Sequence, residues 1–506
     1  MGRARAALLS SAVTLAAISG LAMLGRTPRP GTRCELPTAL PPARPSTERE
    51  VAPRAAPYRP PAVRWVAFGG GAEPSSNQVS MEADLELAGR TLGPGGIVLF
   101  AGGPGSSGVY ELDPTAVVDP VVRELAALFA AHGAGEGRFR TTRLPAHGAA
   151  TRGELFDTLD RALASTGEPL LVYVDCHGDA GATPADNSLA AWGGEAITVR
   201  ELTRRLDGAR RPVRLLVSAC FSGGFSELAF RDAEPGKGAT PNDRCGLFAS
   251  TWDLEATGCD PDPDRRKHEG YAVHLLHALR GQDRDGQAGR VDLDGDGAIS
   301  LLEAHTRARI ASEGLDVPTS TSERWLRHAT PRRGSSATVE LFEEEAVIAA
   351  LSDRLGLTGS RSDLEREARR RFELLEARYE RLVEEERVAN GELQSRQHAV
   401  KGELLARWPE LDDPWNSRHA AVLAGARSAL ERYFAESPLF RAYRRGLEAA
   451  DEAADAALET ALERAPFERL VRALENVTLA GRLKHAGGPD WQRYLRFLEC
   501  ERSRLR

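Results

Sequence analysis

Between about residues 63 and 337, short apolar runs alternate with segments that have the length and polar–apolar pattern of helices. Apolar runs bounded by glycine, proline or polar residues lie at 96–101, 169–175, 213–219 and 246–251. Continuous apolar runs of this kind are typical of strands buried on both faces of a parallel sheet. Helix-length segments lie between these runs, at 121–132, 152–165 and 198–206. The alternation predicts an α/β domain with a parallel sheet over residues 63–337.

After about residue 338 the strand-like runs end, and the chain becomes charged and rich in alanine, leucine, glutamate and arginine. Helices are predicted at 339–353, 362–405, 416–436 and 439–464. In the second of these, apolar residues recur mostly at steps of three and four, which is typical of an amphipathic helix: Leu364, Phe372, Leu375, Tyr379 and Leu382. Residues 338–506 are therefore expected to form an appended all-α hairpin or bundle that packs on the domain or binds a partner.

The N-terminus belongs to neither pattern. Arg3 and Arg5 precede an uncharged stretch that ends at residue 25, which indicates a signal peptide or an uncleaved membrane anchor. Residues 26–62 are rich in proline and arginine and cannot bury a core, so they are expected to be a linker. The protein is therefore expected to be exported, as a periplasmic, envelope-anchored or secreted protein. Membrane contact would come through the N-terminal anchor.

The net charge and the cysteine spacing argue against several classes of function. The net charge is −7 and the chain has no basic stripe, so a nucleic-acid partner is not expected. Cysteines occur at positions 34, 176, 220, 245, 259 and 500, too sparsely for a disulfide scaffold and without the CxxC spacing of zinc or redox sites. In an oxidising compartment, Cys245 and Cys259 are close enough in sequence to form a disulfide that closes a short loop.

Two predicted strands end in residues that suit nucleophilic catalysis. The strand at 169–175 leads into His177 and Gly178, and the strand at 213–219 leads into Cys220. Functional groups collect at the carboxyl ends of parallel strands, so neighbouring strands would bring these side chains to one edge. A thiol needs a nearby imidazole as base, and N–H groups of Gly178 and Cys220 would stabilise an oxyanion. This pattern predicts a cysteine nucleophile with a histidine base.

An apolar strand ending in His-Gly, followed by one ending in Ala-Cys, resembles the clan of cysteine peptidases that includes caspases, metacaspases, gingipains and legumain. The segment Ser218-Ala-Cys-Phe-Ser-Gly-Gly-Phe225 is most similar to the legumain (hemoglobinase) branch, as are Cys245-Gly-Leu-Phe-Ala-Ser-Thr251 and Ala256-Thr-Gly-Cys259. The resemblance spans about residues 95–280. It implies a caspase-like parallel-sheet sandwich and a protein or peptide substrate, with His177 as base, Gly178 as oxyanion donor and Cys220 as nucleophile.

One position departs from the pattern of that clan. Members that cleave after basic residues or asparagine often carry an acidic residue two positions before the cysteine, where this chain has Ser218. Cleavage specificity is therefore not carried over. Asp175 and Asp179 are the candidate substitutes, although each is also compatible with an ordinary loop carboxylate.

Residues 292–303 match the twelve-residue EF-hand loop. Side-chain oxygen ligands for Ca²⁺ are predicted at positions 1, 3, 5, 9 and 12 of the loop, and a backbone carbonyl at position 7: Asp292, Asp294, Asp296, Ser300 and Glu303, with the carbonyl of Ala298. Gly297 stands where the loop requires a sharp turn, and a helix is predicted at 301–312. No second loop in the same register accompanies it, so a structural calcium site is favoured over a sensor.

A competing motif lies after the run at 96–101. Gly103-Pro-Gly105-Ser-Ser-Gly108 has the GxGxxG spacing of a dinucleotide-binding loop, but the residues that follow do not have the pattern of a helix.

The main prediction is an exported cysteine endopeptidase stabilised by one calcium ion. The first alternative is a catalytically silent, calcium-stabilised binding module of the same fold. A Rossmann-type nucleotide-binding protein is the remote alternative.

Overall fold

The computed structural model describes residues 63–505 except 114, 130–136, 166 and 414–415. The predicted leader at 1–25 and the predicted linker at 26–62 both lie outside these residues. Among the described residues, no helix combines the length and the apolar character that crossing a membrane requires.

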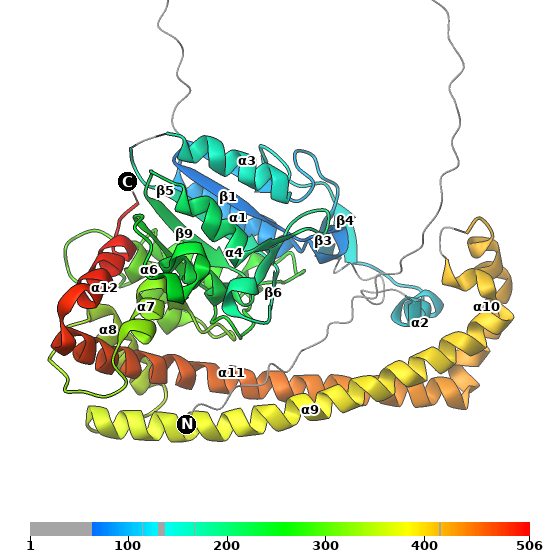
Figure 1. Ribbon diagram of the computed structural model, residues 1–506. Helices are drawn as coiled ribbons and strands as arrows, with labels where there is room; N and C mark the ends of the chain where they lie inside the picture. The colour runs from blue at the N-terminus through cyan, green and yellow to red at the C-terminus, as the bar shows by residue number, and fades with distance from the viewer. Residues whose placement is uncertain (1–62, 114, 130–136, 166, 414–415, 506) are drawn as a thin grey trace, which may run out of the picture. The chain divides into compact units, whose positions relative to one another are not determined.

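A six-stranded sheet with the order β11-β10-β9-β5-β1-β2 lies at the centre of residues 63–337 (Figure 1). Its strands are β1 Trp65–Gly70, β2 Gly96–Phe100, β5 Leu170–Cys176, β9 Val213–Ser218, β10 Arg244–Phe248 and β11 Thr319–Ser320. All neighbours pair in parallel except β11, which is antiparallel to β10. The four predicted strands are confirmed as β2, β5, β9 and β10.

The central strand β1 was not among the predicted strands. Its sequence, Trp-Val-Ala-Phe-Gly-Gly, ends in two glycines, which weaken a strand pattern. Its position between β5 and β2 explains these small residues. A Cβ on Gly69 would lie 2.3 Å from the carbonyl oxygen of Asp175 on β5. Close packing of the backbones at this edge of the sheet, rather than local propensity, therefore selects glycine.

Alternation along the strands divides the core into two layers. Ala67 and Tyr173 pack on one face against α1 Val79–Leu92, α5 Tyr271–Ala278, α6 Leu301–Ala311 and α7 Thr321–Ala329. Phe68 and Val174 pack on the other face against α3 Arg152–Leu163 and α4 Val199–Asp207. Each strand residue is buried on its own side, as expected for a sheet covered by helices on both faces.

Smaller elements border this sheet. β3 Val109–Leu112 and β4 Gly137–Arg140 pair as an antiparallel two-stranded sheet, and α2 Pro120–Phe129 lies between them in the sequence. β6 Gly178–Asp179, β7 Ser188–Ala190 and β8 Ala196–Thr198 form a three-stranded antiparallel sheet directly after β5. The second sheet therefore begins at the glycine that follows His177.

The C-terminal region is helical, as predicted, with α8 Phe342–Arg354, α9 Arg361–Arg407, α10 His419–Glu436, α11 Pro438–Ala486 and α12 Gly488–Glu501. The long helices α9 and α11 run side by side (Figure 1). The predicted end of the fourth helix at residue 464 was wrong, because α11 continues through Pro466. A proline inside a helix costs about 3 kcal/mol. Buried contacts beyond it offset this cost: Phe467 and Leu470 pack against α8, and the guanidinium of Arg469 donates to the carbonyl of Ser312.

A disulfide joins β10 to the last helix. Cys245 pairs with Cys500 on α12, with a Cα–Cα distance of 6.1 Å. The pairing of Cys245 with Cys259, which their spacing in the sequence allowed, is therefore wrong. Cys245 pairs instead with a distant residue, because α12 packs back against the sheet beside β10. Beside the disulfide, the buried carboxylate of Glu501 accepts hydrogen bonds from the N–H and hydroxyl of Ser322.

Candidate functional site

His177 and Cys220 follow two adjacent parallel strands. Asp175 on β5 pairs in register with Ser218 on β9. His177 and Cys220 each lie two residues beyond this pair, so both emerge at the same edge of the sheet. The condition under which the sequence predicted a catalytic pair, that the two strands be neighbours, is confirmed.

Glycines hold the chain close together around Cys220. A Cβ on Gly178 would lie 2.1 Å from the carbonyl oxygen of Cys220. Phe221 adopts a left-handed conformation with φ of 56°, and the short helix Ser222–Ala229 begins directly after it. A Cβ on Gly223 would lie 2.6 Å from the carbonyl oxygen of Ser250. The turn after Cys220 is therefore pressed between two neighbouring backbones and needs glycine on both sides.

The ring of His177 is held through its Nε2 atom. Nε2 lies 2.7 Å from the carbonyl oxygen of Ser76 and 3.2 Å from Oε1 of Gln78. Both partners are acceptors, so Nε2 carries a proton and donates it. The neutral ring then has its lone pair on Nδ1, the nitrogen that a general base uses. Both residues were missed, because no local sequence pattern marks the end of a one-turn 3-10 helix (Ser76) or the N-cap of α1 (Gln78) as a partner of a distant histidine.

The Nδ1 atom of His177 faces a sulfur, but not the predicted one. It lies 3.5 Å from Sγ of Cys259, whose side chain is exposed. Sγ of Cys220 instead accepts a hydrogen bond of 3.3 Å from the N–H of Ala256 and lies 3.5 Å from its carbonyl oxygen. In the described part of the chain, the structure therefore brings His177 and Cys220 to one edge without a hydrogen bond between them.

Burial makes Cys220 a weak acid in this arrangement. It raises the pKa of the Cys220 thiol to about 11, although the N–H of Ala256 acts in the opposite direction. The negative charges of Glu255 and Asp316 raise the pKa further. The thiol is therefore neutral at pH 7 and needs a base to become a nucleophile. Cys176, at the end of β5, is only 2% exposed, and burial raises its pKa well above the usual value.

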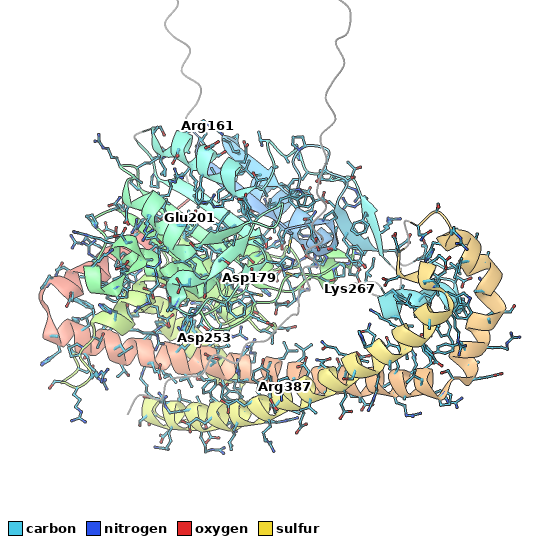
Figure 2. All side chains as sticks on the ribbon, turned by 45° about the vertical axis from the view of Figure 1, so that its right-hand side comes forward. Arg161, Asp179, Glu201, Asp253, Lys267 and Arg387 are labelled. Atoms are coloured by element: carbon cyan, nitrogen blue, oxygen red, sulfur yellow. A yellow bond between two sulfur atoms is a disulfide. The ribbon has the colours of Figure 1, made fainter. Side chains whose placement is uncertain are left out.

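Of the two acidic residues considered for substrate recognition, one is buried and one is exposed. Asp175 is 8% exposed, and its Oδ2 accepts a hydrogen bond of 3.3 Å from the hydroxyl of Tyr173. Burial, and then the charge of Asp84 on α1, raise the pKa of Asp175 well above its usual range. Asp179, labelled in Figure 2, is exposed on β6. Ser218 is buried at the end of β9.

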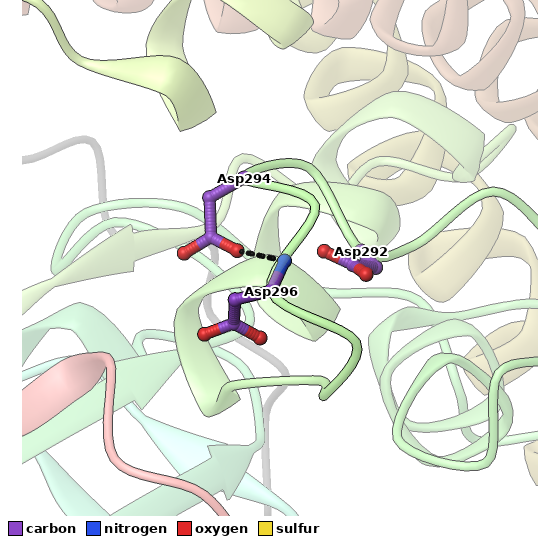
Figure 3. A group of neighbouring side chains, drawn as sticks. All are labelled: Asp292, Asp294 and Asp296. Atoms are coloured by element: carbon purple, nitrogen blue, oxygen red, sulfur yellow. Dashed lines mark hydrogen bonds between the residues drawn. The ribbon is translucent and has the colours of Figure 1, made fainter.

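The carboxylates of Asp292, Asp294 and Asp296 converge, each with an oxygen within 4.8 Å of the others (Figure 3). Backbone N–H groups fold the loop around them: those of Gly295 and Gly297 donate to Asp292, at 2.7 and 2.9 Å. Gly297 has a φ of 82°, so the sharp turn predicted there is confirmed. This set of hard oxygen donors fits Ca²⁺.

The remaining predicted ligands are placed differently. Oε2 of Glu303 accepts hydrogen bonds from the N–H and hydroxyl of Ser300, at 2.8 and 2.9 Å, which forms a capping box at the start of α6. Oε1 accepts from the N–H of Leu293 at 2.7 Å. Arg504 forms an ion pair with Asp296. The structure thus gathers three of the predicted ligands, while Ser300 and Glu303 are engaged with each other.

The glycine-rich loop at 103–108 leads into β3, not into a helix. A Cβ on Gly108 would lie 2.9 Å from the ring of Trp192 and 3.2 Å from Pro74, so this glycine allows close packing. The helix N-terminus that would bind a pyrophosphate does not follow the loop.

No protein-family model and no curated protein sequence matches this chain.

Proposed function

We propose that this protein is an exported cysteine endopeptidase of the caspase and legumain kind, with Cys220 as nucleophile and His177 as base. The observation that supports it best is the register of β5 and β9, which places both side chains two residues beyond a matched pair of strand positions. The close contact between Gly178 and the carbonyl of Cys220 ties the two strand ends together. These features match the pattern that the His-Gly and Ala-Cys motifs imply.

In the proposed reaction, Nδ1 of His177 takes the proton of the Cys220 thiol as the sulfur attacks the substrate carbonyl. The N–H groups of Gly178 and Cys220 would stabilise the developing oxyanion. The imidazolium then gives its proton to the leaving amine, and water hydrolyses the thioester. Throughout, the Nε2–H of His177 stays bonded to Ser76 and Gln78, which keeps Nδ1 as the working nitrogen.

The pair must tighten for this reaction, because Nδ1 contacts Cys259 at rest. Catalytic hydrogen bonds are often long in free enzymes and form only when substrate binds. A peptide entering at this edge of the sheet would displace the imidazole from Cys259 toward Cys220. The neutral thiol of Cys220 then loses its proton within the enzyme–substrate complex, not before it.

We assign a structural calcium ion to the loop that begins at Asp292. Asp292, Asp294 and Asp296 would bind it directly, and Ala298, Ser300 and Glu303 complete the predicted ligand set. The ion would neutralise the carboxylates that meet there and stabilise the start of α6. No predicted calcium ligand belongs to the proposed catalytic dyad of His177 and Cys220.

Two observations favour the silent alternative, a binding module without activity. Burial keeps the Cys220 thiol neutral by raising its pKa to about 11, and the sulfur that contacts Nδ1 belongs to Cys259. A protein that has lost catalysis but kept the fold would show the same features.

The experiment that separates the two is hydrolysis of a diverse peptide library by wild-type protein, Cys220→Ala and His177→Ala. Loss of a nucleophile or its base lowers the rate by about four to six orders of magnitude. The matched control is Cys34→Ala, which removes a thiol of the predicted linker. Cleavage by wild type and control but by neither dyad variant supports the peptidase. Equal cleavage by Cys220→Ala, or none by any protein, overturns it.

A further inference from the structure

A second thiol shares the histidine of the candidate site. Cys259 lies 3.5 Å from Nδ1 of His177 and is exposed, whereas Cys220 is half-buried. The loop that carries Cys259 also carries Ala256, whose N–H bonds to Sγ of Cys220. One short segment, 256–259, therefore touches both the nucleophile and its base. The proposed mechanism uses Cys220 and gives Cys259 no role.

The geometry points to a redox-sensitive thiol pair: Cys259 is a resolving cysteine that closes a reversible disulfide with Cys220 and thereby blocks the site. A small-molecule disulfide, such as oxidised glutathione, is the oxidant. Only the effect of closure on hydrolysis rests on the proposed function, because the disulfide chemistry needs no peptidase activity.

Closure takes two exchange steps. Nδ1 of His177 accepts the proton of Cys259, and the thiolate attacks the external disulfide, forming a mixed disulfide and releasing one small-molecule thiolate, which takes the proton from the imidazolium. Nδ1 then accepts the proton of Cys220, whose thiolate attacks Sγ of Cys259 and releases the second small-molecule thiol. Two protein thiols are oxidised and one external disulfide is reduced, so atoms and electrons balance.

Three features of the site suit this exchange. Solvent reaches Cys259, so an external disulfide meets it before it meets Cys220. Sγ of Cys259 lies 3.5 Å from Nδ1 of His177, so the imidazole is placed to accept the proton of this thiol. Gly258, with a φ of 151°, gives the segment backbone freedom beside Cys259.

The other described cysteines are not available for this exchange. Cys245 and Cys500 are already joined as a disulfide, and Cys176 is buried at the end of β5. Among the described cysteines, Cys220 and Cys259 are thus the pair that an oxidant reaches. The protein therefore loses its reactive thiol in oxidising conditions and regains it with a thiol reductant.

The test is to treat the full chain with oxidised glutathione, then to map disulfides by mass spectrometry of a non-reduced digest. Alkylation of Cys220 is measured before and after oxidation. We expect a peptide pair linking Cys220 to Cys259 and a fall in Cys220 alkylation of about tenfold or more, reversed by dithiothreitol. In Cys259→Ser the link is absent and alkylation of Cys220 stays close to its starting value. The control Cys34→Ser behaves as wild type.

The outcomes separate this inference from the peptidase proposal. Cys220 and Cys259 found as free thiols or as separate glutathione adducts after oxidation would overturn the thiol pair, even in a protein that cleaves peptides. A Cys220–Cys259 link in a protein that hydrolyses no peptide supports the thiol pair and counts against the peptidase. If Cys259→Ser does not fold, the link in wild-type protein decides alone.

Discussion

Gly178 lies directly against the backbone of Cys220: a Cβ at position 178 would be 2.1 Å from the carbonyl oxygen of Cys220. The contact joins the end of β5 to the turn after β9. It positions the peptide group of the proposed nucleophile by steric fit, since neither backbone has room to move toward the other. A side chain at position 178 must therefore displace Cys220 or its own strand.

We expect Gly178→Ala to lower kcat/KM for a peptide substrate by about a hundredfold, because a misplacement of about 1 Å has that effect on a positioned reacting group. The matched control is Gly153→Ala on α3, where a Cβ meets nothing within 4 Å. Thermal unfolding of both variants distinguishes displacement from loss of the fold. Unchanged kinetics in Gly178→Ala would mean that the contact does not set the position of Cys220.

Gln78 is expected to act by positioning His177. Its Oε1 is the weaker of two acceptors for Nε2–H, at 3.2 Å against 2.7 Å for the Ser76 carbonyl. Gln78→Ala leaves the backbone acceptor in place, so we expect kcat to fall by about tenfold with KM little changed. Gln78→Glu keeps an acceptor and should retain most of the activity. A loss that appears only in KM would place Gln78 in substrate binding instead.

The sequence predicted the strand ends better than their surroundings. His177, Gly178 and Cys220 could be found because parallel strands bring their carboxyl ends to one edge, and a β-branched run followed by a polar residue marks such an end. Ser76 and Gln78 could not, because their contact with His177 depends on how the short segment before α1 packs against the distant end of β5. The same holds for Cys259, since contact with Nδ1 is a matter of tertiary position.

The predictions of the disulfide partner of Cys245 and of the end of the last long helix were wrong for a related reason. Sequence separation favoured Cys259 as the partner of Cys245, yet the true partner is 255 residues away on α12. The last helix was predicted to end at residue 464, but buried packing beyond Pro466 carries α11 onward to residue 486. In both cases long-range packing outweighed a local preference.

The Cys220 thiol should react slowly at neutral pH. Its pKa of about 11 lies above the usual value because of burial, so the thiolate fraction at pH 8 is only about one in a thousand. The rate of alkylation by iodoacetamide should therefore rise about tenfold per pH unit from pH 7 to 10. Mass spectrometry of the labelled peptide measures it. A plateau below pH 8 would instead indicate a preformed thiolate–imidazolium pair and would contradict this prediction.

Calcium should stabilise the fold without taking part in catalysis. Repulsion among the converging carboxylates of Asp292, Asp294 and Asp296 should loosen the loop when no cation is present. A bound ion stabilises the native state by about 2.7 kcal/mol at a free concentration a hundredfold above its Kd. We expect a chelator to lower the Tm, Asp292→Ala to copy this in excess calcium, and Asp285→Ala, an exposed acid outside the group, to leave it unchanged. Superimposed melting curves with and without chelator would argue against a bound ion.

The disulfide between Cys245 and Cys500 should contribute to stability and also hold the C-terminal tail on the acidic loop. Beyond Cys500, the carbonyl of Ser503 accepts a 3.0 Å hydrogen bond from the N–H of Leu301, the first residue of α6. Arg504 pairs with Asp296. The disulfide links residues 255 apart in the sequence and so closes a long loop. We therefore expect Cys500→Ser to lower the free energy of unfolding by about 2 to 5 kcal/mol. Denaturant titration measures the change, and the control is internal: a reductant should destabilise wild type to the same level and leave Cys500→Ser unaffected. Equal stability of oxidised wild type and variant would show that α12 stays docked through its apolar contacts alone.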